Sequence, residues 1–151
     1  MGTELSLARL IVVEDFSPLR ELICSILGQE RGLQIIAEVS DGLEAVQKAE
    51  ELKPDLILLD IELPTLDGLA AARQIRKLAP ESKIIFVSQE SSPAVVQEAF
   101  NLGARGYVAK TMVASDLLVA IKVVVEGRRF VSSGLLGDNL TDTNSRPSAD
   151  Y

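Results

Sequence analysis

Short apolar runs alternate with stretches of helical periodicity five times along the chain. The runs cover residues 9–13, 34–39, 56–60, 83–88 and 106–109. All five runs are short, and the first four are rich in Ile, Val and Leu, which favours strands buried on both faces. The alternation predicts an α/β fold with a parallel sheet between two layers of helices. Right-handed crossovers leave few topologies, and the flavodoxin-like strand order 2-1-3-4-5 suits five strands.

Capping residues mark the boundaries of the expected helices. Ser17 before Pro18 predicts the start of the first helix, and Gly32 predicts its end. The remaining helices are expected over 42–52 after Asp41, 68–78 after Asp67, 93–102 after Ser92, and 114–126.

The composition indicates one globular domain and excludes several kinds of chemistry. Hydrophobic residues make up 47% of the 151 residues and charged residues 25%, and no apolar run has the ~20 residues that span a bilayer. Because Glu4 precedes the first apolar run without a basic start, we expect no signal peptide and a cytoplasmic protein. Cys24 is the single cysteine and there is no histidine, which excludes an internal disulfide and histidine-dependent nucleophilic schemes. A net charge of −7 without a basic stripe predicts no direct nucleic-acid binding.

Polar side chains stand at the carboxyl ends of four of the five runs. Glu14 and Asp15 follow the first, Asp60 ends the third, Ser88 the fourth, and Lys110 follows the fifth. Because the carboxyl ends of parallel strands meet at the edge where α/β folds bind ligands, we expect these side chains to converge. Each has an ordinary explanation by itself, as a helix cap, a strand end or a surface charge. Five of them at one edge favour a site.

The residue types indicate phosphoryl chemistry at this edge. Crowded carboxylates raise each other's pKa unless a cation joins them, and a small all-oxygen site suits Mg²⁺ rather than zinc. A carboxylate such as Asp60 beside Mg²⁺ can attack phosphorus and become an aspartyl phosphate. The Lys110 ammonium and the Ser88 hydroxyl could then neutralise and bind the phosphoryl oxygens.

Four segments together resemble the receiver domain of bacterial two-component response regulators. They are Glu14-Asp15, LILLDIELPTLDG, IIFVS and GYVAK, and the resemblance runs from about Arg9 to Gly127. It implies a CheY-like fold in which Asp60 accepts a phosphoryl group from a histidine of a sensor kinase. Such a domain is not an enzyme with a separate substrate, but it catalyses its own phosphorylation and dephosphorylation.

The resemblance also implies a role for each candidate residue. Asp15, Asp60 and the backbone carbonyl of Glu62 would bind Mg²⁺, assisted by Glu14. Lys110 would contact the phosphoryl group, Ser88 would be the switch hydroxyl, and Tyr107 would turn inward with the switch. The partner surface would then be helix 93–102, strand 106–109 and helix 114–126. Gln89 departs from the family, which has a very small residue after the switch hydroxyl.

The region after the fifth strand resembles the LuxR/NarL-like class of regulators. Thr111 follows Lys110 where many receivers have proline, and that class continues into a helix-turn-helix domain. We expect a receiver domain over 1–130 and a disordered polar tail, or the start of a linker, over 131–151. The chain would regulate transcription through an output domain outside it, or act as a stand-alone receiver on a partner or a second copy of itself.

A phosphatase of the haloacid dehalogenase type is the rival interpretation. Asp60 with Glu62 resembles the Asp-x-Asp start of those enzymes, and GDNLTD at 137–142 resembles their late acidic motif. The chain is short for that fold, and no strand pattern precedes GDNLTD.

Overall fold

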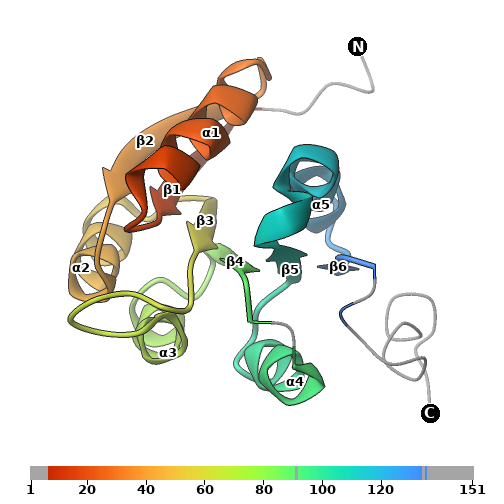
Figure 1. The fold of residues 1–151 in the computed structure, drawn as a ribbon. Coiled ribbons are helices and arrows are strands. Elements are labelled where there is room, and N and C mark those ends of the chain that lie inside the picture. Colours follow the sequence, from red (N-terminus) through yellow and green to blue (C-terminus); the bar gives the residue numbers. More distant parts are fainter. Residues whose placement is uncertain (1–6, 91, 134, 136–151) are drawn as a thin grey trace.

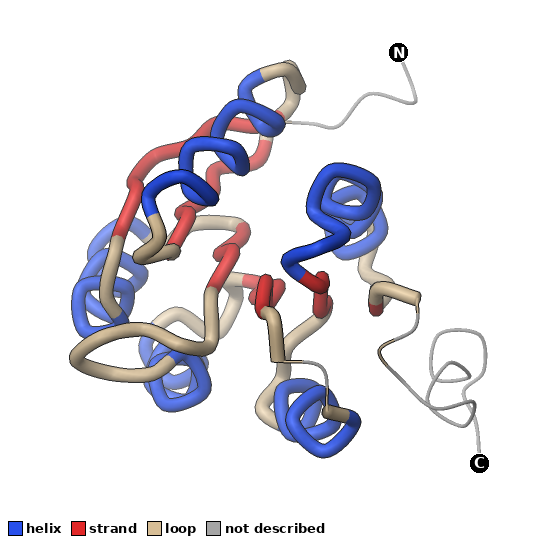
Figure 2. The backbone as a smooth tube through the Cα atoms, in the orientation of Figure 1, coloured by secondary structure: helices blue, strands red, loops and turns tan. Residues whose placement is uncertain are grey.

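A six-stranded parallel sheet with helices on both faces forms the molecule (Figures 1 and 2). The computed structural model describes residues 7–90, 92–133 and 135. The strands are β1 (Ala8–Val13), β2 (Leu33–Val39), β3 (Leu56–Leu59), β4 (Lys83–Ser88), β5 (Gly106–Ala109) and β6 (Phe130–Val131). The helices are α1 (Ser17–Gly28), α2 (Gly42–Leu52), α3 (Gly68–Leu78), α4 (Pro93–Asn101) and α5 (Val113–Val125), with a 3₁₀ turn at Lys110–Met112.

The two faces of the sheet bury two separate hydrophobic clusters. In β3, Leu56 and Leu58 face α1 and α5, whereas Ile57 and Leu59 face α2, α3 and α4. All four residues are buried, which explains why the strand is an unbroken apolar run rather than an alternating one. The central position of β3 brings Asp60, the next residue, to the middle of the sheet edge.

The predicted fold class is confirmed, with one strand more than expected. The order is β2-β1-β3-β4-β5-β6, so the first five strands follow the predicted 2-1-3-4-5 arrangement. The sixth strand, β6, pairs in parallel with β5 through Gly106↔Phe130 and Tyr107↔Val131. Because β6 has only two residues, it shows no hydrophobic periodicity, and the sequence analysis did not predict it.

Three of the four predicted helix caps are confirmed by side-chain hydrogen bonds. The side chains of Asp41, Asp67 and Ser92 accept backbone N–H groups three residues on, at 2.7, 2.9 and 3.2 Å. The prediction that Ser17 caps α1 is wrong. The Arg20 N–H already bonds to the Phe16 carbonyl at 3.0 Å, so Phe16 is the cap and makes no side-chain bond there.

The end of α1 and the expected end of the domain both differ from the prediction. The end of α1 is Gly28 rather than Gly32, since Gly32 instead precedes β2, where its carbonyl accepts the Ala8 N–H at 2.8 Å. The expected boundary after residue 130 falls inside β6, and Leu135 is buried beyond it. Residues 136–151, including GDNLTD, lie outside the described part of the chain. Within the described residues, no helix is long and apolar enough to cross a membrane.

Candidate functional site

Three of the predicted residues form a buried ion-pair cluster at the carboxyl edge of the sheet. The Lys110 Nζ lies 3.0 Å from Asp60 Oδ2 and 3.3 Å from each carboxylate oxygen of Glu14. Asp60 and Glu14 are each 1% exposed, whereas the Lys110 side chain is 16% exposed. Residues from the ends of β1, β3 and β5, 96 positions apart at the extremes, therefore meet at one point, as predicted.

Asp15 completes an acidic group that faces an open pocket. One carboxylate oxygen each of Glu14, Asp15 and Asp60 lie within 4.8 Å of one another. The side chain of Asp15 is exposed, so the group is reached from solvent. The pocket has a volume of about 550 Å³ and is lined by Glu14, Asp15, Phe16, Leu19, Asp60, Glu62, Gln89, Lys110 and Thr111.

Burial dominates the electrostatics of this group. It raises the pKa of Asp60 above its ordinary value, even though Lys110 hydrogen-bonds to the carboxylate. Burial and then the charge of Asp60 raise the pKa of Glu14. Burial by itself would lower the pKa of Lys110, but the hydrogen bond and charge of Asp60, together with Glu14, raise it. The ammonium of Lys110 is thus the shared ion-pair partner of the buried carboxylates of Glu14 and Asp60.

One buried carboxylate oxygen lacks a hydrogen bond. Glu14 Oε1 is buried and has no hydrogen-bond partner among the described residues, although the Lys110 ammonium is within ion-pair distance. The other oxygen, Oε2, accepts the Phe16 N–H at 3.1 Å. A buried anionic oxygen without a donor is costly, and a hard cation is a partner that would satisfy it. The oxygen-only donor set therefore fits a divalent cation such as Mg²⁺.

The loop after β3 holds the Asp60 carboxylate in place. The Glu62 N–H donates to Asp60 Oδ1 at 3.3 Å, and the Gly68 N–H donates to the Ile61 carbonyl at 2.6 Å. A Cβ on Gly68 would lie 2.0 Å from the Asp60 carbonyl oxygen, so only glycine lets α3 begin this close to the strand end. Close packing against the backbone of Asp60 therefore requires glycine at position 68, directly after the Asp67 cap.

Most of the chain matches the model of a known family. A model described as the response regulator receiver domain matches residues 10–122. The chain belongs to the response regulator receiver family. This assignment overturns the phosphatase interpretation.

Individual relatives support the assignment. The response regulator GacA of Pseudomonas viridiflava is 32% identical over 124 residues, which cover 82% of this chain and 58% of GacA. The chemotaxis protein CheY of Listeria monocytogenes is 35% identical over 114 residues, covering 76% of this chain and 95% of CheY. Among solved structures, a LuxR-family response regulator from Aurantimonas sp. matches with a TM-score of 0.83 and 29% identity, over 93% of this chain and 100% of that one. This receiver domain therefore spans little more than half of GacA but nearly all of CheY.

The two predicted switch residues of the receiver domain are linked through the backbone of Glu90. The Ser88 Oγ accepts the Glu90 N–H at 2.9 Å, and the Tyr107 hydroxyl donates to the Glu90 carbonyl at 2.8 Å. Tyr107 is fully buried, its ring centroid is 6.2 Å from that of Phe86, and burial raises the pKa of its phenol. The ring therefore already occupies the inward position that was expected only with the switch. Ser88 is also buried and is not among the residues that line the pocket.

Three residues of the receiver pocket were not predicted from sequence. Phe16, Leu19 and Thr111 line it, and Phe16 is 61% exposed. The position of a phenylalanine directly after the acidic pair is visible in the sequence, whereas its exposure is known only from the structure. Gln89, noted for its bulk, is exposed and does line the pocket.

Proposed function

We propose that this receiver domain is the phosphoacceptor of a two-component phosphorelay. Asp60 receives a phosphoryl group from a phosphohistidine of a sensor kinase, and Lys110 and Ser88 bind that group. The observation that carries the proposal is the buried Asp60 carboxylate, paired with Lys110 at 3.0 Å and opening on a pocket of about 550 Å³. The pocket is large enough to admit a phosphoryl group.

The acidic group supports a Mg²⁺ site beside the acceptor. Asp15 and Asp60 would bind the ion through their carboxylates and Glu62 through its backbone carbonyl, with Glu14 assisting. The proximity of the three carboxylates within 4.8 Å and the unpartnered Glu14 Oε1 support this set. The bound ion would neutralise charge on the transferring phosphoryl group.

The transfer step uses the Asp60 carboxylate as nucleophile. An Oδ electron pair of Asp60 forms the new P–O bond while the P–N bond of the donor breaks, and its electron pair stays on the imidazole, which then takes up a proton. The Lys110 ammonium is held where charge on the phosphoryl oxygens develops, so it needs little reorganisation during the reaction. This self-catalysed step, with later hydrolysis of the acyl phosphate, is the domain's own chemistry.

The relatives support a regulatory output. GacA is named a response regulator, and the Aurantimonas protein belongs to the LuxR family. The chain covers 58% of GacA and 52% of DegU of Brevibacillus brevis, which is named a transcriptional regulatory protein. We therefore infer that transcription is regulated through an output domain, with no nucleic-acid binding by the receiver itself. A sensor kinase and a second copy of the chain are the proposed partners, in the cytoplasm. A stand-alone receiver, as the 95% coverage of CheY allows, is the alternative.

Incubation with acetyl phosphate and Mg²⁺ tests the proposal. We expect the intact protein to gain the mass of one phosphoryl group, mapped to Asp60 after borohydride trapping and proteolysis. Omission of Mg²⁺ should prevent the gain. A modification at another carboxylate, or none, would overturn the assignment of the acceptor.

A further inference from the structure

The chain beyond α5 returns to the sheet and pairs in parallel with β5. We call residues 129–133 together with Leu135 the C-terminal strap. In Figure 1, β6 lies beside β5 with α5 on one side and α4 on the other. The strap therefore contacts the elements expected to form the partner surface of the receiver, and its contacts can respond to changes in them.

Backbone hydrogen bonds attach the strap to the free edge of β5, opposite β4. The Phe130 N–H donates to the Arg105 carbonyl at 3.1 Å, and the Ser132 N–H donates to the Tyr107 carbonyl at 3.0 Å. A strand of two residues has few ladder bonds, so its attachment depends on the side chains around it.

A buried serine locks the strap to β5 and α5. Ser132 is 1% exposed, and its Oγ accepts the Ala109 N–H at 3.1 Å while donating to Asp116 Oδ2 at 2.7 Å. Asp116 is anchored in turn by the Ser115 hydroxyl, which donates to its Oδ1 at 3.0 Å. Hydrogen bonds to a carboxylate are the stronger kind, and a buried hydroxyl that loses them is costly.

The other side of the strap packs on α4 and the core beneath it. The Arg129 guanidinium lies 5.5 Å from the ring centroid of Phe100 on α4, a cation–π contact. Leu135 is 7% exposed and belongs to the same core cluster as Tyr107, with Val131 packed against that cluster. The inward Tyr107 ring and the apolar residues of the strap therefore belong to one core cluster.

A continuous series of hydrogen bonds joins the strap to the phosphoacceptor edge. The Ser88 hydroxyl accepts the Glu90 N–H, and the Tyr107 hydroxyl donates to the Glu90 carbonyl. The backbone N–H of Ser132 donates to the Tyr107 carbonyl. Spatial continuity is not coupling by itself, but each link depends on the position of the next. The last link, Ser132 to Asp116, ends on α5.

We propose that the C-terminal strap is a switchable sixth strand that transmits the phosphorylation state of Asp60 to the chain after Leu135. The inference rests on the proposed function. A phosphoryl group that draws in Ser88 favours the inward Tyr107, and the strap is engaged in the structure that has Tyr107 inward. Phosphorylation therefore tightens the strap and fixes where the following chain leaves the domain, as a shift between engaged and released states.

Amide hydrogen exchange at the strap tests this coupling directly. The probe is beryllofluoride with Mg²⁺, a phosphoryl mimic whose binding is followed separately by fluorine NMR. We expect exchange of the Phe130 and Ser132 amides to slow by about fivefold or more, the lower end of ordinary allosteric couplings. Absence of beryllofluoride binding would overturn the proposed function and the coupling with it. Binding with unchanged exchange at both amides would overturn the strap proposal alone.

Two variants separate coupling from simple stability. Ser132→Ala should release the strap, abolish the slowing and weaken beryllofluoride binding by the same factor, because coupling is reciprocal. Its matched control is Ser133→Ala, since Ser133 is exposed, and it should behave as the parent protein. Exchange in β1 and β3 reports whether the fold is intact. If Ser132→Ala kept the full slowing and affinity, the strap would have no part in the switch. Tyr107→Phe, which removes the hydroxyl that reaches Glu90, should still bind beryllofluoride, more weakly by the same factor, and should lose the slowing. Retention of the slowing in this variant would overturn the proposed route.

Discussion

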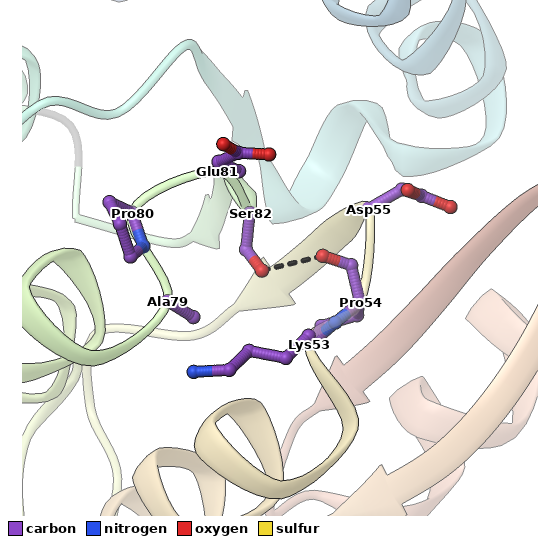
Figure 3. A pocket seen from close by; sticks show the side chains of 7 residues that line it. All are labelled: Lys53, Pro54, Asp55, Ala79, Pro80, Glu81 and Ser82. Atoms are coloured by element: carbon purple, nitrogen blue, oxygen red, sulfur yellow. Dashed lines mark hydrogen bonds between the residues drawn. The ribbon is translucent and has the colours of Figure 1, made fainter.

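The two edges of the sheet carry similar residue types and differ in how those residues are satisfied. At the amino edge, Lys53, Asp55 and Ser82 help to line a pocket of about 390 Å³ between α2, α3 and the starts of β3 and β4 (Figure 3). The Lys53 Nζ donates to the Leu78 carbonyl at 2.5 Å, and Ser82 Oγ donates to the Pro54 carbonyl at 2.5 Å. A lysine, a carboxylate and a serine thus all occur at both edges.

The partners are neutral backbone groups at the amino edge and charges at the carboxyl edge. The Lys53 and Asp55 side chains are exposed, and Asp55 Oδ2 accepts the Arg9 N–H at 2.8 Å. At the carboxyl edge, buried Glu14 and Asp60 share the ammonium of Lys110, and one Glu14 oxygen has no hydrogen bond from the part of the chain that the structure describes. At the amino edge, backbone groups satisfy the lysine and the serine, whereas at the carboxyl edge two buried carboxylates depend on one ammonium.

The largest difference between the edges is expected from removing one carboxylate charge at each. Asp60→Asn should abolish phosphorylation by acetyl phosphate, because an amide cannot attack phosphorus, while Asp55→Asn should leave it unchanged. Intact-protein mass spectrometry measures both. The Asp60 variant should also unfold at the same or a higher temperature, since it relieves a crowded buried charge. Equal phosphorylation of the two variants would remove the distinction between the edges.

Loss of the lysine at each edge should separate them in stability. Breaking a fully buried ion pair costs roughly 3–5 kcal/mol. Because the Lys110 side chain is 16% exposed, we expect Lys110→Gln to lower the free energy of unfolding by about 2 kcal/mol in EDTA. Lys53→Gln should change it by less than about 0.5 kcal/mol, as at other exposed positions. Urea unfolding checks both, and equal losses would show that the Lys110 cluster is an ordinary surface network.

Added Mg²⁺ should stabilise only the carboxyl edge. A ligand that binds only the native state at ten times its Kd contributes about 1.4 kcal/mol. We expect the melting temperature to rise with Mg²⁺ in the parent protein and in Asp55→Asn. The rise should be lost in Asp15→Asn, which keeps the buried pair intact but removes the exposed carboxylate. A rise that survives in Asp15→Asn would place the cation elsewhere.

The smallest expected effect is a loss of folding stability as the pH rises, the opposite of the pH dependence that a stabilising salt bridge gives a carboxylate. The pKa values of Glu14 and Asp60 are raised in the folded state, so the folded protein binds more protons than the unfolded chain above the ordinary carboxyl range of about 4. Stability from these two groups therefore falls as pH rises through the interval between the unfolded and the folded pKa. The melting-temperature difference between Asp60→Asn and the parent, in EDTA, should grow over that interval and vanish below it. A difference independent of pH would show that the charge of Asp60 does not destabilise the fold.

The sequence by itself predicted the architecture apart from β6, and it predicted the polar residues at the carboxyl edge of the sheet. Buried parallel strands must be apolar along their length, so the five long strands are visible as runs, and the first polar residue after each run marks its carboxyl end. Parallel strands place those ends at one edge, which is why Glu14, Asp15, Asp60, Ser88 and Lys110 could be predicted to lie at one edge. The caps Asp41, Asp67 and Ser92 followed from local hydrogen bonding alone.

Only the tertiary structure decided which of those residues are buried and which partners they contact. Glu14 and Asp15 are adjacent and equally acidic in sequence, yet one is 1% exposed and the other faces solvent, because the chain turns between them. The inward Tyr107 depends on a carbonyl 17 residues away, and β6 depends on Ser132 bonding to Asp116 on another element. Local patterns carry no information about such long-range pairs. The burial of a side chain and the partners it contacts are fixed only when distant segments pack together. In this protein these two properties distinguish the carboxyl edge of the sheet from the amino edge.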